Sequence, residues 1–247
     1  MDKLIPVKIL GIPVSPYTMA SAVDFLQESV LKQQNIFVVT ANAEIIMLAK
    51  ENPDYMEVLI HQADLILPDG AGTVWAGRTL GYNIPERVAG YDLFLQLLSV
   101  AAKQKLPVYF FGGAPGIADN AALCGQKRYP GLIVAGTHNG YFTEDEVPDI
   151  IEKINQSGAQ MLFAALGAPK QEYWLACNAK KLKPFLRMGI GGSFDVLAGK
   201  VRRAPQWMQD AKLEWFYRLI KQPSRFTRML ALPRFVACIL AAKQKKN

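Results

Sequence analysis

The chain has 247 residues, of which 51% are hydrophobic and 20% are charged, a length that suits one large domain or a core with an appendage. This composition excludes a disordered or low-complexity chain. The longest uncharged stretch, residues 154–169, is too short and too broken by glycine and proline to cross a bilayer. Charged residues precede any apolar run, so we expect no secretory signal. Three scattered cysteines indicate free thiols in a reducing compartment.

The net charge of +7 is unevenly distributed along the chain. Residues 199–247 carry 12 of the 28 Lys and Arg residues but only 2 of the 21 Asp and Glu residues. The excess positive charge therefore lies in the last fifth of the chain. A basic segment after a near-neutral core indicates an anionic partner, which could be nucleic acid, an anionic membrane surface or a phosphorylated substrate.

Short apolar runs recur through the first 195 residues, separated by segments of helical length and period. Helices are expected over residues 19–31 and 91–105, among others. This alternation predicts βα units, and so an α/β core over residues 1–198 with a buried, mainly parallel sheet. The expected strands are Ile36–Val39, Leu65–Leu67, Val108–Phe111, Leu132–Val134, Met161–Leu166 and Met188–Ile190.

Small and polar residues follow five of the six expected strands. In an open α/β sheet, ligands bind outside the carboxyl ends of the strands. Small residues there let a ligand approach the backbone, and the helix N-termini beyond them supply N–H donors. We therefore expect one site built from five loops. These loops begin at Thr40, Pro68, Gly112, Gly167 and Gly191.

Asp69 is the candidate general base, because it follows an expected strand and has no neighbouring cation in the sequence. The alternative is an aspartate that caps a helix or shapes a turn, since Asp before Gly is common in loops. Asp195 raises the same question with a stronger structural alternative. It lies just inside an expected helix start, where a carboxylate complements the helix dipole.

Thr40 and Asn42 could hydrogen-bond a sugar or a phosphate, or could cap the helix that is expected to start near Ala43. Arg87 lies in a loop between a proline and a glycine and suits a phosphate clamp. A salt bridge of Arg87 with Glu86 or another acid explains it equally well.

Gln171 follows a strand and could read a base or a sugar amide, or could lie in a solvated first helical turn. The pairs Gly112 with Gly113 and Gly191 with Gly192 suit a backbone nest for a diphosphate, although glycine pairs also occur in ordinary turns. Neither pair is followed by the lysine of a P-loop, and the dinucleotide fingerprint is incomplete.

We expect no metal site and no cofactor. The two histidines, His61 and His138, are far apart, and no Asp-x-Asp pair is present. The charge of a diphosphate would then be met by Arg, Lys and helix ends. A pair of unit charges about 4 Å apart interacts by roughly 4 kcal/mol at an effective dielectric constant near 20, so a few such pairs suffice.

Aromatic and basic residues interleave in the segment 199–247, which Pro205, Pro223 and Pro233 divide into short helices. This pattern favours docking on an anionic membrane surface. Binding to nucleic acid and a merely solvated charged face are the alternatives. The apolar side of such helices needs a cover away from the membrane, so a homo-oligomer is also expected.

Taken together and in order, these segments resemble the WecG/TagA/CpsF glycosyltransferase family, and the appendage is similar to that of the TagA branch. The ordered set is far more specific than any single motif in it. The matching segments are Thr40–Glu44, Leu67–Gly70, Pro85–Gly90, Phe111–Gly113, Leu166–Glu172, Gly191–Asp195, Gly199–Pro205 and Leu213–Leu219.

The resemblance implies a Rossmann-like α/β core with a basic, aromatic-rich helical appendage, residues 199–247, that docks on the membrane and completes the site. It implies an inverting, metal-independent transferase on the cytoplasmic face of a bacterial membrane. The implied donor is UDP-N-acetylmannosamine, and the implied acceptor is N-acetylglucosamine linked by diphosphate to undecaprenol, for wall teichoic acid. Transfer of the uronic acid form of the donor sugar, for another surface polysaccharide, is the alternative.

By the same resemblance, Asp69 would deprotonate the acceptor hydroxyl, and Thr40 and Asn42 would line the sugar pocket. Arg87 and Gln171 would hold the diphosphate or the acceptor. The appendage would contribute arginines that meet phosphate charge. These are Arg218, Arg225 and Arg228.

Two other classes of function remain open from the sequence. A nucleotide-dependent oxidoreductase could use a similar sheet, but the dinucleotide fingerprint is missing. A non-enzymatic adaptor for membranes or nucleic acid would not need polar and glycine-rich loops at the strand ends.

Overall fold

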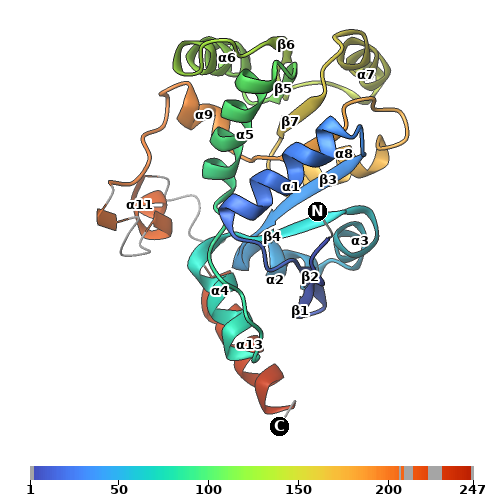
Figure 1. Cartoon of the computed structure of the whole chain (residues 1–247). Coiled ribbons are helices and arrows are strands. Elements are labelled where there is room, and N and C mark those ends of the chain that lie inside the picture. Colours follow the sequence, from blue (N-terminus) through green and yellow to red (C-terminus); the bar gives the residue numbers. More distant parts are fainter. Residues whose placement is uncertain (1–2, 206, 209–213, 222–229, 246–247) are drawn as a thin grey trace.

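The computed structural model describes residues 3–205, 207–208, 214–221 and 230–245, and a six-stranded parallel sheet lies at its centre (Figure 1). The strand order is β4-β3-β8-β7-β5-β6. A separate antiparallel hairpin joins β1 (Val7–Ile9) and β2 (Ile12–Val14). The strands of the sheet are β3 (Ile36–Ala41), β4 (Leu65–Pro68), β5 (Val108–Gly112), β6 (Val134–His138), β7 (Met161–Ala165) and β8 (Leu186–Gly189).

Successive side chains of each inner strand pack on opposite faces of the sheet, as the pleat requires. In β3, Val38 belongs to one apolar core, whereas Phe37 and Val39 belong to the other. Each core is closed by its own helices, so the architecture has three layers, α/β/α. The first core is covered by α1 (Met19–Leu31), α5 (Gly90–Gln104), α6 (Ile117–Arg128) and α9 (Ser193–Leu197). The second is covered by α2 (Ala43–Glu51), α3 (Pro53–Glu57), η1 (Val58–Gln62), α4 (Gly70–Thr79), α7 (Val147–Gln156), α8 (Lys170–Cys177) and α13 (Ala231–Gln244).

The α/β class and the parallel sheet predicted from the sequence are confirmed. The helix predicted over residues 19–31 is α1 without change, and α5 ends one residue before the predicted boundary, with Lys105 in the left-handed conformation at its end. The predicted strand Leu132–Val134 overlaps β6 at a single residue, whereas the bounds of the other predicted strands agree within two residues. The chain turns at Leu132, whose N–H bonds to the Tyr129 carbonyl, and strand β6 starts only at Val134.

The error has a physical cause. Strand β6 lies at the edge of the sheet and is half-buried along its length, so it needs no continuous apolar run. Its Gly136 leaves room for the ring of Tyr109, because a Cβ there would lie 2.5 Å from Tyr109 Cε2. Periodicity therefore moved the expected strand toward the more apolar residues before it.

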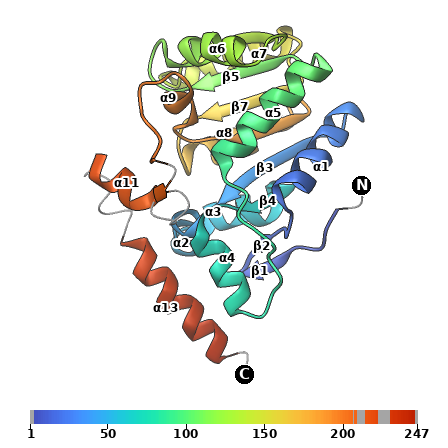
Figure 2. The ribbon, with the colours of Figure 1, turned by 60° about the vertical axis from the view of Figure 1, so that its left-hand side comes forward.

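The last helix, α13, packs against α2 and α4 (Figure 2). Its Phe235 and Ile239 are 1% and 0% exposed and belong to the second core. Spacing of four residues places both side chains on one face of the helix. The division of the chain at residue 199 stays a prediction, and α13 is a part of the appendage that contributes to the core.

In the part of the chain that the structure describes, every helix is too short or too polar to cross a membrane.

Candidate functional site

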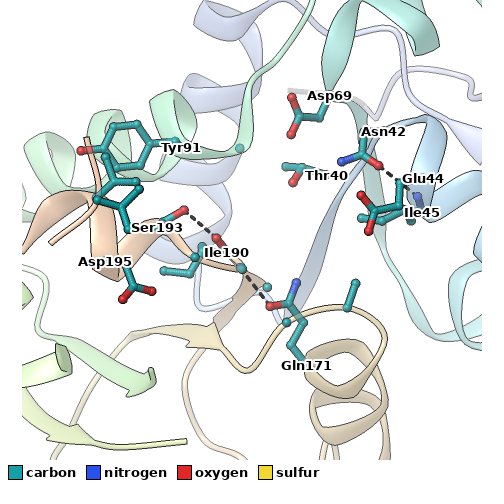
Figure 3. Close-up of a pocket in the computed structure, with 18 of the residues that line it drawn as sticks. Thr40, Asn42, Glu44, Ile45, Asp69, Tyr91, Gln171, Ile190, Ser193 and Asp195 are labelled. Carbon is teal, nitrogen blue, oxygen red and sulfur yellow. Dashed lines mark hydrogen bonds between the residues drawn. The ribbon is translucent and has the colours of Figure 1, made fainter. Parts of the chain in front are cut away.

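A pocket of about 240 Å³ lies at the carboxyl ends of β3, β4, β7 and β8 (Figure 3). The loops that follow these four strands meet there, as the sequence predicted for parallel strands. In the view of Figure 3, Asp69 and Thr40 lie across the pocket from Tyr91 and Asp195. Side chains that line it are Thr40, Asn42, Glu44, Ile45, Asp69, Tyr91, Gln171, Ile190, Ser193, Asp195, Val196, Val201, Arg202 and Tyr217.

Asp69 occupies the N-cap position of α4, yet its side chain makes no capping hydrogen bond. Its backbone N–H donates to the Ala41 carbonyl at 3.0 Å, and the left-handed Gly70 then begins the helix. Thr73 fixes the turn from the helix side, because its hydroxyl donates to the carbonyls of Ala41 and Asp69, at 3.0 Å each. The turn thus keeps the carboxylate of Asp69 at the pocket wall, where it can accept a proton.

Arg87 contacts Asp69, with 3.7 Å between Nε and Oδ1. Both side chains are about one quarter exposed, at 27% and 24%. The neighbouring Glu86 instead accepts a hydrogen bond from the Met19 backbone N–H, on a different part of the surface. Arg87 does not itself line the pocket. Its ion pair with Asp69 makes it a neighbour of the candidate base, and the phosphate contact expected from the sequence stays a prediction.

Asn42 both caps a helix and borders the pocket, the two alternatives that the sequence left open. It caps α2 through its side-chain oxygen, which accepts from the Ile45 N–H at 3.0 Å, and it lines the pocket. Thr40 is 8% exposed and lines the pocket from the end of β3. Gly90 is required beside it, because a Cβ at this position would lie 2.6 Å from Thr40 Oγ1.

Gln171 lies in the first turn of α8 and is buried, at 4% exposed. Its Oε1 accepts a hydrogen bond from the Gly191 N–H at 3.0 Å, and its Nε2 donates to Glu172 Oε1 at 2.7 Å. The side-chain amide therefore already has partners at both ends within the protein. It borders the pocket and also holds the loop after β8.

The two glycine pairs are placed differently. Gly191 and Gly192 line the pocket, as expected. Gly113 lines a second hollow that adjoins the first, and Gly112 lines neither. A Cβ on Gly112 would lie 2.4 Å from the Ala165 carbonyl oxygen, so its role is close packing of β5 against β7. The expected contribution of Gly112 to a backbone nest stays a prediction.

The adjoining hollow lies beyond the ends of β5 and β7 and shares Gly167, Gly191, Gly192 and Asp195 with the pocket. Lys170 is part of its wall, with Nζ 4.6 Å from the centre of the Phe142 ring. The two hollows therefore lie side by side at the carboxyl edge of the sheet.

Four further residues line the pocket that the sequence did not assign to the site: Tyr91, Asp195, Arg202 and Tyr217. Asp195 lies in the first turn of α9, as the helix-dipole alternative holds, and also borders both hollows. Tyr217 comes from α11 (Glu214–Lys221), so the appendage reaches the pocket. Asp195, Arg202 and Tyr217 lie in segments that carry the family resemblance, but only the folded structure shows that their side chains reach the pocket. The run of positive charge near Arg202 was the available signal.

The sequence predicts three further appendage arginines in the site, Arg218, Arg225 and Arg228. Arg218 lies on α11, but the structure describes only its backbone, and Arg225 and Arg228 lie outside the described residues. Within the described ranges, no group of three or more His, Cys, Asp and Glu side chains is arranged to hold a metal ion.

Comparison with known proteins agrees with this geometry. Residues 7–247 match the model of the "Glycosyl transferase WecG/TagA/CpsF family". Three similar proteins each bear the name N-acetylglucosaminyldiphosphoundecaprenol N-acetyl-beta-D-mannosaminyltransferase. The one from Bacillus spizizenii is 38% identical, over 90% of this chain and 86% of its own. Those from Bacillus subtilis and Staphylococcus aureus are 36% and 32% identical, each over 97% of this chain and 92% and 94% of their own. The chain is therefore a member of the WecG/TagA/CpsF family of glycosyltransferases.

Proposed function

We propose that the chain transfers N-acetylmannosamine from UDP-N-acetylmannosamine to N-acetylglucosamine-diphospho-undecaprenol, with inversion at the anomeric carbon and without a metal ion. The main structural support for this proposal is the position of Asp69, whose carboxylate lies at the pocket wall and does not cap helix α4. The names of the relatives supply the substrates.

The reaction is a single displacement. The acceptor hydroxyl oxygen forms a bond to the anomeric carbon of the donor while the bond from that carbon to the UDP phosphate oxygen breaks. Asp69 takes the hydroxyl proton, and UDP leaves with the bonding electron pair. We infer that the positive charge of Arg202, which lines the pocket, stabilises the leaving diphosphate.

A transfer assay tests this function. Purified protein is mixed with a synthetic N-acetylglucosamine-diphosphate-lipid and with UDP-N-acetylmannosamine or its uronic acid form, with and without EDTA. We expect a disaccharide-lipid from the first donor in both buffers. Product only from the uronic acid form would identify the alternative donor. Absence of product from both donors, on vesicles and in solution, would refute the proposal.

We also propose that the appendage binds the inner surface of the cell membrane, where such an acceptor lies. Support comes from α13, on which Val236 and Leu240 are 41% and 47% exposed and lie one turn apart, followed by Lys243 and Lys245. Sedimentation with vesicles tests this, and binding to anionic but not to neutral vesicles is expected. The expected homo-oligomer stays a prediction that sedimentation velocity can check.

A further inference from the structure

Glu172 is a buried carboxyl group that the proposed reaction does not use. It follows Gln171 in the first turn of α8 and is 1% exposed. Burial raises the pKa of its carboxyl group. Placing such a group in the core is costly unless it has polar neighbours, and the buried hydroxyl of Tyr55 lies beside this carboxyl group. Glu172 Oε1 accepts a short hydrogen bond from Gln171 Nε2 at 2.7 Å.

The hydrogen bond between Gln171 and Glu172 is the first of two hydrogen bonds that connect Glu172 to the pocket wall. Gln171 Nε2 donates to Glu172, and Gln171 Oε1 accepts from the Gly191 N–H at 3.0 Å, as Figure 3 shows for the second contact. The two ends of a glutamine amide have the same shape but opposite hydrogen-bonding character. An acceptor at Glu172 therefore determines which end faces Gly191.

Gly189 packs closely against the side-chain amide of Gln171. Gly189 ends β8, and a Cβ on it would lie 2.6 Å from Gln171 Nε2. Gly191 has a φ of +54°, in the left-handed region, and borders both hollows. The peptide that the Gln171 amide holds is thus part of the wall on which the ligand would lie.

We propose that Glu172 is a positioning residue: by accepting a hydrogen bond from Gln171 Nε2, it orients the amide that holds the Gly191 loop in its ligand-binding shape. The inference rests on the proposed function, since it concerns the pocket for the nucleotide sugar. Glu172 acts through Gln171, because it does not line the pocket itself.

Three variants separate positioning from simple core packing. Glu172→Gln keeps a carbonyl oxygen that can accept from Gln171. Glu172→Leu keeps an apolar side chain of similar size but accepts nothing. Gly189→Ala displaces the Gln171 amide by steric contact while Glu172 stays unchanged. This third variant tests the proposal even if Glu172→Leu folds poorly. For each variant, UDP affinity is measured by calorimetry, kcat and donor KM by the transfer assay, and Tm by thermal unfolding.

We expect the UDP Kd and the donor KM to rise about tenfold in Glu172→Leu and in Gly189→Ala, the effect of one lost buried hydrogen bond. In Glu172→Gln both should stay within about twofold of wild type. The changes in UDP Kd and donor KM should not correlate with the changes in Tm across the three variants. A residue that only fills the core would alter Tm, and glutamine in its place would not restore UDP binding.

The proposal is overturned if Glu172→Leu and Gly189→Ala bind UDP as wild type does, or if Glu172→Gln is as defective as Glu172→Leu. Wild-type protein that binds UDP in a Glu172-dependent way but transfers no sugar would support the positioning role and refute the proposed function. Wild-type protein that neither binds UDP nor transfers sugar would overturn both.

Discussion

Arg87 Nε lies 3.7 Å from Asp69 Oδ1, so the candidate base has a cation as its neighbour. At this distance the guanidinium attracts the carboxylate and helps to hold it in place beside the pocket. The two residues come from different loops, at the end of β4 and before α5, and the sequence does not link them.

Replacing Arg87 by methionine should lower kcat about 10- to 100-fold, the effect of losing one interaction with a charged group. Arg87→Lys keeps the charge but not the position of Nε, and should lie between methionine and wild type. Steady-state kinetics of the transfer reaction measures both. Lys103→Met, on the exposed side of α5, is the matched control and should act as wild type. Equal kcat in Arg87→Met and wild type would contradict a role beside Asp69.

Phe235 should contribute strongly to stability although it lies in the appendage. It is 1% exposed and packs in the core under α13. Phe235→Ala should lower the free energy of unfolding by about 3–5 kcal/mol, because it leaves a cavity. Val236→Ala, at an exposed neighbouring position, should change it by less than about 0.5 kcal/mol. Denaturant titration measures both, and similar small effects would show that α13 is not part of the core.

A paired contact joins the segment after α9 to the start of α5. Arg203 Nη1 and Nη2 donate to the two carboxylate oxygens of Asp92, at 2.5 and 2.8 Å. The guanidinium also lies 5.3 Å from the ring centre of Tyr91, which borders the pocket. The pair therefore ties the appendage side of the pocket wall to the core.

Arg203→Gln should raise the donor KM several-fold and destabilise the protein by no more than about 1 kcal/mol, because the pair is partly exposed. Asp92→Asn should have the same effect, and the double variant should add little to either single one. Denaturant titration and steady-state kinetics of wild type, the two single variants and the double variant give a double-mutant cycle. Strict additivity of the two changes would contradict a coupled pair.

The stability of wild type should depend on pH through Glu172. Because burial raises the pKa of this carboxyl above its ordinary 4.5, the folded state keeps a proton that the unfolded chain releases. The unfolded state then binds fewer protons, so the free energy of unfolding decreases as pH rises from about 4.5 to the folded pKa, by at most about 1.4 kcal/mol per pH unit. Burial also raises the pKa of the adjacent Tyr55, which stays neutral over this range.

Glu172→Gln removes this titration. Denaturant titrations of wild type and variant at a series of pH values should show the advantage of wild type shrinking above pH 4.5 and then levelling off. A difference that stays constant with pH would mean that Glu172 titrates alike in the folded and unfolded chains.

Much of this architecture could be predicted from sequence, for reasons visible at single residues. Inner strands such as β5 are buried on both faces and read as apolar runs, whereas the half-buried edge strand β6 does not. Asp69, Thr40 and Asn42 could be found because strand ends of a parallel sheet converge.

Residues that depend on tertiary contact could not be found in this way. The pairing of Arg87 with Asp69, the approach of Tyr217 to the pocket and the burial of Phe235 each join segments far apart in the chain. Gln171 was predicted as a ligand contact, but the fold also uses its amide to hold Gly191. A one-dimensional pattern contains no signal for such contacts.

The most direct measurement compares kcat of wild type and Asp69→Asn in the transfer of N-acetylmannosamine to the lipid acceptor, with UDP affinity and Tm measured on the same samples. Removal of the general base should lower kcat about 10²- to 10⁴-fold, while Tm and UDP affinity stay near wild type. Asp24→Asn, at an exposed position of α1 that lines neither hollow, is the matched control. Wild-type turnover by Asp69→Asn would show that Asp69 is not the base.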